Sequence, residues 1–518
     1  MKNYKVLITT SGVGSRLGEL TSYTNKCLIR VGKKPAISYI IESYPNDTKF
    51  VITLGYYGKH VKDFLELAYP NKNFTFVEID NYEGEGSSLG YSLLKTKKYL
   101  QQPFIFHASD TIINEKVDAP TSNWIGVCEK INHSQYRTVG TDTSLKIFEK
   151  GEMGSKLAYI GLAGINDYQN FWKELEISYL EDPNNSKLSD CHSLNKIIDK
   201  DTWSVINFNS WLDVGNVSEL KKSRESVSDK FEVLDKVNES IFLFDSFVIK
   251  FFYSEEMCKN RVLRGNSLGK LTPKILDFKD NFYKYEYAKG DLFSTVVNEN
   301  LFDSFLEWSL NNLWHKKSTK TNFYSTCDNF YFDKSVSRIN SFLKEHNIVD
   351  SKQKINGYDV PPVLEMLNGI DKDWLCKSTP YQFHGDYILD NIIYEGNLSF
   401  KLLDWRQDFG GDLYYGDIYY DLAKLNHNLL FNHDIVNEGH YNVKSNNGEI
   451  RCDILRSDIL SQCRKKLHYF IEKKGYDLKK VKVLTSLVWL NMAPLHEPRM
   501  GRFLFYLGKI NLYKSLKL

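Results

Sequence analysis

The chain has 518 residues, too many for one ordinary domain core, so two or three domains are expected. Its 67 lysines and arginines nearly balance 65 aspartates and glutamates, which argues against a nucleic-acid or membrane-surface partner and favours small-molecule substrates. No stretch approaches the roughly 20 apolar residues of a membrane span or forms a signal peptide, so a cytoplasmic protein is expected. The eight scattered cysteines indicate reduced thiols, and the sequence leaves open whether the chain forms a homo-oligomer.

A glycine-rich turn follows the first predicted strand. Residues 6–10 have the composition of a buried strand, and the turn after them contains Gly12, Gly14, Ser15 and Arg16. Such a turn is a candidate phosphate loop. Glycines after a strand often serve only to turn the chain, so this motif alone leaves phosphate binding open.

Apolar strands then alternate with helical patterns, which predicts an α/β domain with a Rossmann-like layer order. The predicted strands are 50–54, 74–79 and 103–107, and the helical patterns fall near 59–67 and 88–99. Ligands of open α/β sheets bind at the carboxyl ends of the strands. Asp110 follows the strand 103–107 at such an end and is a candidate metal ligand.

Residues 1 to about 225 resemble sugar-1-phosphate nucleotidyltransferases such as glucose-1-phosphate thymidylyltransferase. The resemblance rests on the glycine turn, on Thr24-Asn25-Lys26, on the segment 34–42, and on Trp211-Leu212-Asp213-Val214-Gly215. It implies a GT-A-like fold in which the glycine turn and Arg16 wrap a nucleoside triphosphate and Lys26 neutralises charge in the transition state. This sequence has Asn25 where that family usually has proline.

The same resemblance implies further ligands. Asp110 and Asp213 would share Mg²⁺, which favours oxygen ligands and substrate phosphates. Gly86 would contact the nucleotide base. The residues expected to bind the acceptor phosphate are Glu149, Lys150 and Gly161. Taken without the neighbouring motifs, the Glu-Lys pair could equally be an exposed strand end.

A polar stretch without aromatic residues, 221–230, predicts a boundary near residue 229, with domains 1–228 and 229–518. Beyond it, residues 241–244 and 247–252 alternate like the strands of a hairpin, with Lys250 in the middle of the second. A lysine in an apolar strand is rare without a partner, because burying an ammonium group is costly.

The most informative stretch of the second half is His384-Gly385-Asp386, followed by Asn391 and by a strand that ends at Asp404. Phosphoryl transfer from ATP requires a carboxylate on a tight turn, an amide on the same loop and a second carboxylate after the next strand. Asp386 would orient and deprotonate the attacking hydroxyl, and Asn391 and Asp404 would hold Mg²⁺. A buried histidine with solvated loop acids is the alternative, but several elements agree in order and spacing.

These motifs resemble the choline kinase and aminoglycoside phosphotransferase family, and the segment 416–423 extends the match. The resemblance implies a two-lobed, protein-kinase-like α+β domain, in which Lys250 contacts the ATP phosphates and Glu286 lies on the hinge strand beside adenine. The sequence departs from kinases in having no glycine-rich loop before Lys250. Aromatic residues such as Trp405 could line an acceptor pocket, although core packing is the favoured interpretation.

The two resemblances together predict consecutive reactions. A kinase would phosphorylate a sugar, polyol or choline-like alcohol with ATP, and a nucleotidyltransferase would transfer a nucleotide from CTP or UTP to that phosphate, giving an activated precursor for surface glycan synthesis. One alternative is a nucleotidyltransferase whose kinase-like half is a regulatory or binding module. Antibiotic phosphotransfer is another, but it leaves the first domain unexplained.

Overall fold

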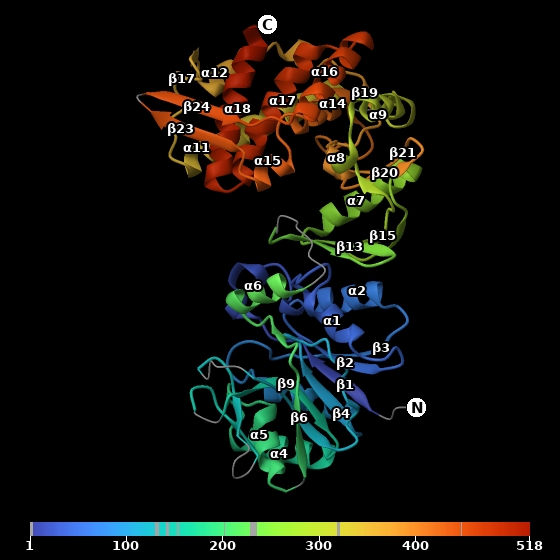
Figure 1. The fold of residues 1–518 in the computed structure, drawn as a ribbon, viewed down its shortest axis with the longest axis vertical. Coiled ribbons are helices and arrows are strands. Elements are labelled where there is room, and N and C mark those ends of the chain that lie inside the picture. Colours follow the sequence, from blue (N-terminus) through green and yellow to red (C-terminus); the bar gives the residue numbers. More distant parts are fainter. Residues whose placement is uncertain are drawn as a thin grey trace. The chain divides into compact units, whose positions relative to one another are not determined.

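A computed structural model describes residues 4–129, 134–140, 145–152, 155–200, 202–227, 236–318, 322–446 and 448–517 (Figure 1). The chain forms two compact units, the first made of residues 1–255 and 276–285 and the second of residues 256–275 and 286–518. The boundary predicted between residues 228 and 229 lies outside the described residues and stays a prediction.

A mixed sheet forms the centre of the first unit. Its strands are β1 (Lys5–Thr9), β2 (Lys49–Leu54), β3 (Asn73–Glu78), β4 (Phe104–Ala108), β6 (Asn123–Glu129), β9 (Leu157–Ile165) and β10 (Trp203–Asn207), in the order β10-β6-β9-β4-β1-β2-β3. All neighbours are parallel except β9, which runs antiparallel to β4 and β6. β7 (Thr138–Gly140) and β8 (Lys146–Phe148) extend the sheet as a hairpin, and β5 (Thr111–Ile112) pairs separately with β11 (Leu212–Asp213). The predicted α/β class is confirmed for this unit.

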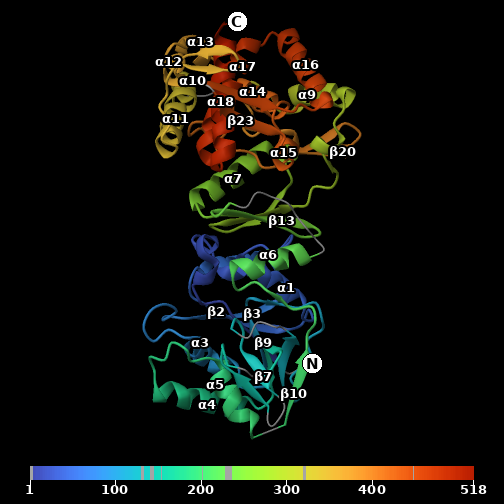
Figure 2. The ribbon, with the colours of Figure 1, turned by 60° about the vertical axis from the view of Figure 1, so that its left-hand side comes forward.

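Helices cover both faces of this sheet (Figures 1 and 2). Val6 and Ile8 of β1 belong to the core beneath α1 (Ala36–Glu42) and α2 (Gly58–Ala68). Leu7 belongs to the opposite core, beneath α3 (Leu89–Thr96), α4 (Tyr168–Glu181) and α5 (Asp190–Ile198). Alternate residues of a strand face opposite sides, so a strand that is apolar throughout serves two cores. α6 (Val217–Ser226) follows the last strand pair.

A second, smaller sheet also belongs to the first unit. It contains β12 (Glu239–Leu243), β13 (Phe247–Phe252), β15 (Phe282–Glu286) and β14 (Ile275–Phe278), in that order. The ring of Phe64 on α2 lies 5.3 Å from that of Phe242 and 6.1 Å from that of Phe282, with Phe244 and Phe251 in the same core. These five side chains, called here the aromatic cluster, join the small sheet to α2.

The second unit is mainly helical. Its longer helices are α7 (Glu255–Leu268), α9 (Glu299–Asn312), α11 (Lys334–Glu345), α14 (Ile418–Asn428), α16 (Asp458–Lys473), α17 (Leu478–Met492) and α18 (Pro498–Lys517). Its shorter helices are α8 (Phe293–Val296), α10 (Phe323–Asp328), α12 (Val363–Asn368), α13 (Lys372–Cys376) and α15 (His433–Asn437).

Small sheets complete the second unit. β16 (Asp291–Leu292), β20 (Ile392–Gly396) and β21 (Ser399–Leu402) form one; β17 (Gln353–Ile355), β18 (Tyr358–Val360), β23 (Tyr441–Asn446) and β24 (Glu449–Ile454) form another; β19 (Pro380–Tyr381) pairs with β22 (Gly416–Asp417). β20 and β21 lie between the His-Gly-Asp turn and Asp404, so this hairpin carries both kinase-like motifs.

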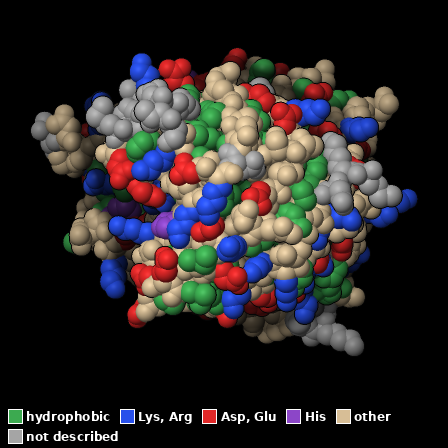
Figure 3. Space-filling model, turned by 90° about the horizontal axis from the view of Figure 1, so that it is seen from below, with side chains coloured by type: hydrophobic (Ala, Val, Ile, Leu, Met, Phe, Trp, Pro, Cys, Tyr) green, Lys and Arg blue, Asp and Glu red, His purple; other side chains and the backbone are tan. Residues whose placement is uncertain are grey.

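On the face drawn in Figure 3, basic and acidic side chains are interspersed without a large field of one sign. Among the described residues, no helix combines the length and apolar character that crossing a bilayer requires.

Candidate active sites

A cavity of about 430 Å³ opens at the carboxyl ends of β1 and β4. Seven of the predicted ligands of the first domain line it: Gly12, Arg16, Lys26, Asp110, Lys150, Gly161 and Asp213. Four others are outside this lining: Gly14, Ser15, Gly86 and Glu149. The sequence motifs thus converge on one site although they are up to about 200 residues apart along the chain.

The glycine turn and Lys26 are held together by local packing. Gly14 has a φ of 74°, and a Cβ there would lie only 2.9 Å from the Cβ of Lys26, so glycine is needed on both counts. Asn25 is fully buried and donates hydrogen bonds to the carbonyl oxygens of Thr10 (2.7 Å) and Tyr56 (2.6 Å). These bonds fix the backbone beside Lys26 where proline would do so in the family.

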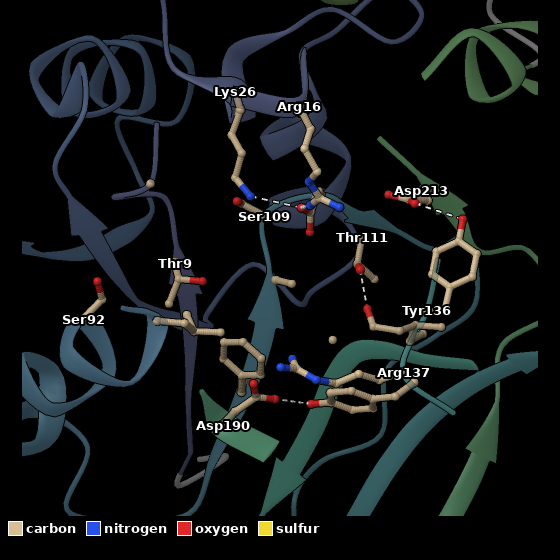
Figure 4. A pocket seen from close by; sticks show the side chains of 18 of the residues that line it. Thr9, Arg16, Lys26, Ser92, Ser109, Thr111, Tyr136, Arg137, Asp190 and Asp213 are labelled. Carbon is tan, nitrogen blue, oxygen red and sulfur yellow. Dashed lines mark hydrogen bonds and ion pairs between the residues drawn. The ribbon is translucent and has the colours of Figure 1, made fainter. Parts of the chain in front are cut away.

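The carboxylates of Asp110 and Asp213 lie near each other. A Cβ on Gly215 would be 3.2 Å from Asp110 Oδ2 and 3.0 Å from Asp213 Oδ1, so these two oxygens are at most about 6.2 Å apart. Lys26 Nζ lies 3.0 Å and Arg16 Nη2 3.9 Å from Asp110 Oδ2. Figure 4 shows both cations extending toward this point.

The two carboxyl groups have opposite pKa shifts. Burial acts to raise the pKa of Asp110, but Lys26 and Arg16 outweigh it and the pKa is lowered. The pKa of Asp213 is raised, by burial and by the charge of Asp110, although Asp213 accepts hydrogen bonds from the Gly215 N–H (2.7 Å) and the Tyr136 hydroxyl (3.0 Å). Two repelling carboxylates in a cavity are suited to a shared cation.

The donor set fits a hard cation such as Mg²⁺. Both groups offer only oxygen, which this ion prefers, and no set of three or more His, Cys, Asp or Glu side chains able to hold a metal occurs in the described parts of the chain. Asp110 and Asp213 would therefore hold the ion together with substrate phosphates and water.

Basic side chains form the other wall of the cavity. The pKa of Lys150 is lowered by burial and by the nearby charges of Arg16 and Arg137. Glu149 lies 3.0 Å from Arg137 Nε and therefore holds this arginine instead of lining the cavity. A concentration of positive charge in a partly enclosed cavity is suited to phosphate groups.

Arg137, Tyr136 and Asp190 line the cavity but were missed by the sequence reasoning. Arg137 precedes β7 and Glu149 follows β8, and the hairpin pairs Thr138 with Phe148. A hairpin prediction over this segment would have brought the two charges together. Asp190 accepts a hydrogen bond of 2.6 Å from Tyr159 and had no sequence signal.

In the second unit, the His-Gly-Asp turn is held by a buried carboxylate. Asp421 on α14 is fully buried and accepts hydrogen bonds from the backbone N–H groups of His384 (2.8 Å) and Gly385 (2.7 Å). Burial raises the pKa of Asp421 to about 6, although these bonds act to lower it. Gly385 has a φ of 88°, which turns the chain toward Asp386.

Asp386 is in direct contact with Asn391 and Lys424. Asn391 Nδ2 donates to the backbone oxygen (2.9 Å) and to Oδ2 (3.2 Å) of Asp386, and Lys424 Nζ lies 2.7 Å from Asp386 Oδ1. Asp404 has a φ of 55° and lies 3.0 Å from Arg261 Nη1. The charge of Asp404 acts to raise the pKa of Asp386, which is nevertheless lowered because Lys424 outweighs both this effect and burial.

The sequence motifs did not identify Lys424 or Arg261, nor the role of Asp421. Asp421 lies in the segment 416–423 that extended the kinase resemblance, but only the fold shows which N–H groups it binds. Lys250 is buried on β13 of the first unit, and Glu286 is exposed at the end of β15.

Comparisons with known proteins concern the first part of the chain, and no protein-family model matches. A segment of 89 residues, 17% of the chain, is 32% identical to the Bacillus subtilis (strain 168) protein named "Probable glucose-1-phosphate cytidylyltransferase". The chain spans about a third (34%) of the length of that relative.

Solved nucleotidyltransferase structures align with a similar part of the chain. CTP:phosphocholine cytidylyltransferase from Streptococcus pneumoniae matches 43% of this chain and 98% of its own, at 19% identity and a TM-score of 0.36. The inositol-1-phosphate CTP transferase from T. maritima matches 44% and 99%, at 16% identity and a TM-score of 0.34. The sequence similarity of the chain is thus to a protein named as a cytidylyltransferase, over 89 residues.

Proposed function

We propose that the chain is a bifunctional enzyme. One half phosphorylates a small hydroxyl compound with ATP, and the other transfers a nucleotide from an NTP to the resulting phosphate. The product is a nucleotide-activated precursor of a surface glycan. The observation that carries the proposal is the cavity, which is lined by the cations Arg16, Lys26 and Lys150 and by the carboxylates Asp110 and Asp213. The name of the Bacillus subtilis relative supports CTP as the nucleotide, with UTP as the alternative.

In the nucleotidyl transfer, an oxygen of the acceptor phosphate attacks the α-phosphorus of the NTP. The bond from that phosphorus to the bridging oxygen breaks, and pyrophosphate leaves with the electron pair. Arg16 and Lys26 stabilise the charge that develops on the phosphates, and Lys150 and Arg137 orient the acceptor phosphate. Bound Mg²⁺, held by Asp110 and Asp213, would offset the negative charge of the two reactants.

In the kinase reaction, Asp386 accepts the proton of the attacking hydroxyl and Asn391 holds Asp386 in position. Asn391 and Asp404 are the proposed ligands of the ATP-bound Mg²⁺. Lys250 and Glu286 stay candidates for ATP binding.

A second candidate function is a nucleotidyltransferase whose kinase-like half binds a regulator without catalysis. It is favoured by two ion pairs, because Lys424 pairs with Asp386 and Arg261 with Asp404, so both key carboxylates already have cationic partners.

Two variants separate these functions. Asp386→Ala should lower the rate of ADP release by a factor on the order of 10²–10⁴, because the general base is lost. Pyrophosphate release from a preformed sugar phosphate should remain intact. Asp213→Asn should do the reverse. Sugars, polyols and choline are screened with ATP in a coupled assay. A wild-type chain that releases pyrophosphate but phosphorylates no compound would favour the regulatory alternative.

A further inference from the structure

Three cations, Lys334, Arg338 and Arg406, lie close enough to affect one another's pKa, and Arg406 lies against the turn that carries Asp386. A Cβ on Gly385 would be 2.6 Å from Arg406 Cβ, and the Arg406 N–H donates to the carbonyl oxygen of His384 at 3.0 Å. The side chain of Arg406 therefore begins directly beside the His-Gly-Asp turn.

Two of these cations lie over the aromatic ring of Phe330. Lys334 Nζ lies 3.8 Å and Arg406 Cζ 5.1 Å from its centroid, so the two are at most about 8.9 Å apart. Arg338 follows Lys334 by one turn of α11. Tyr420 packs edge-on against the same ring at 4.9 Å, one turn of α14 before Lys424, which connects the cluster to Asp386.

Within the described ranges no carboxylate forms an ion pair with these cations, although the charge of Asp408 acts to raise the pKa of Lys334. Arg406 Nε donates to the backbone oxygen of Asp408 (2.9 Å) and Arg338 Nη1 to that of Asn491 (2.8 Å), and the Asp408 carboxylate accepts from the Gly411 N–H. All three side chains are partly exposed. Burial and mutual repulsion lower the pKa of Lys334 and of Arg338. An incoming anion would relieve this repulsion.

We propose that Lys334, Arg338 and Arg406 bind an anionic group of the kinase acceptor, which is therefore an alcohol with a carboxylate or phosphate, not choline or a neutral polyol. This inference rests on the proposed kinase function of Asp386. The hydroxyl oxygen of the bound acceptor forms a bond to the γ-phosphorus of ATP, the bond to the β–γ bridging oxygen breaks, ADP leaves, and the hydroxyl proton passes to Asp386.

The first test uses the full chain, ATP and alcohols that differ in charge. Glycerol is compared with glycerate and with glycerol 3-phosphate, glucose with gluconate and with glucose 6-phosphate, and choline is the cationic member. The kcat/KM for ADP release should be at least about tenfold higher with the anionic alcohol than with its neutral partner. Added KCl should raise the KM for the anionic alcohol, because salt screens the charges. The carboxylate and phosphate arms identify the anion. A preference for choline or for the neutral members would overturn the proposal.

Variants test the named residues. Lys334→Met and Arg406→Met should each raise KM for the anionic alcohol about tenfold or more, with kcat nearly unchanged. Lys344→Met removes an exposed charge from the same helix and is the matched control, for which no change is expected. Pyrophosphate release should be unaffected in all three. An unchanged KM in Lys334→Met and Arg406→Met would contradict the assignment.

A binding measurement keeps this inference separate from the kinase proposal. If no alcohol yields ADP, the kinase proposal fails, and hydrogen exchange with inorganic phosphate as the probe still tests the anion site. Phosphate should slow exchange over residues 334–345 and 404–409 of the wild-type chain but not of the Lys334→Met/Arg406→Met double variant. Equal exchange with and without phosphate in the wild type would refute the site.

Discussion

Replacing Gly215 by alanine tests whether Asp110 and Asp213 act as a pair. The new Cβ would lie 3.0 Å from Asp213 Oδ1 and 3.2 Å from both Asp110 Oδ2 and Arg16 Nη2. Non-bonded atoms prefer about 3.5 Å or more, so each of these polar atoms would have to retreat by roughly 0.3–0.5 Å. The substitution therefore displaces oxygens of both carboxylates without removing either carboxylate.

The size of the effect follows from the strain. Overpacking of this kind costs about 1–3 kcal/mol. If this energy is lost from transition-state binding, at about 1.4 kcal/mol for each factor of ten, kcat/KM for pyrophosphate release falls about 5- to 150-fold. Since the displaced oxygens are the proposed Mg²⁺ ligands, the Mg²⁺ concentration for half-maximal activity should rise as well.

The assay measures pyrophosphate release over a range of Mg²⁺ concentrations, with thermal melting as the check on folding. Gly369→Ala, at the end of α12, is the control, because its Cβ would meet neighbours at the ordinary distances of 3.5 and 3.6 Å. It should leave activity unchanged. Wild-type rate and Mg²⁺ dependence in Gly215→Ala would show that the two carboxylates do not share an ion.

Three further predictions concern residues around the first cavity. Asn25→Ala leaves the buried carbonyl of Thr10 and the partly buried carbonyl of Tyr56 without their donor, so urea unfolding should show a loss of about 1–3 kcal/mol, and wild-type stability would contradict this role. Burial lowers the pKa of His107 to about 4, so the unfolded chain takes up this proton first and stability should fall by about 2–3 kcal/mol between pH 7.5 and 4.5. In His107→Phe, which also loses the hydrogen bond to Thr111, urea unfolding should depend less on pH; an equal dependence would exclude His107 as a source. Glu149→Gln should raise KM for the acceptor phosphate severalfold, and less than Arg137→Met does, because Glu149 acts through Arg137; the reverse order in steady-state kinetics would place Glu149 on the substrate.

Several residues that line the first cavity could be predicted because each directly follows a recognisable strand or belongs to a compact motif. Lys26, Asp110 and Asp213 are of this kind, and the cavity brings them together. Arg137 and Asp190 were not predicted as cavity residues, since their place in the cavity depends on how a hairpin and the start of a helix pack against the sheet. Local patterns identify elements, but they do not specify long-range neighbours.

Two strands of the small sheet, β12 and β13, were also predicted close to their observed positions, but not the core that they join. An apolar alternation such as that of β13 predicts one buried face without specifying its partner. The polar stretch 221–230 indicated a boundary there, whereas Phe242 and Phe282 pack against α2. A polar stretch of sequence thus says little about whether the elements on its two sides share a core.

The aromatic cluster limits how this gene could be recombined. Phe242, Phe244, Phe251 and Phe282 are each less than a tenth exposed, and burying one such side chain contributes about 1.5–3 kcal/mol. A chimaera that exchanges residues 1–227 for the corresponding domain of another enzyme would lose Phe64 and the rest of the α2 face, and would leave these rings in water. Exchange of the first domain is therefore viable only when the donor enzyme carries a matching apolar helix, so the two halves of the sequence are expected to be inherited together.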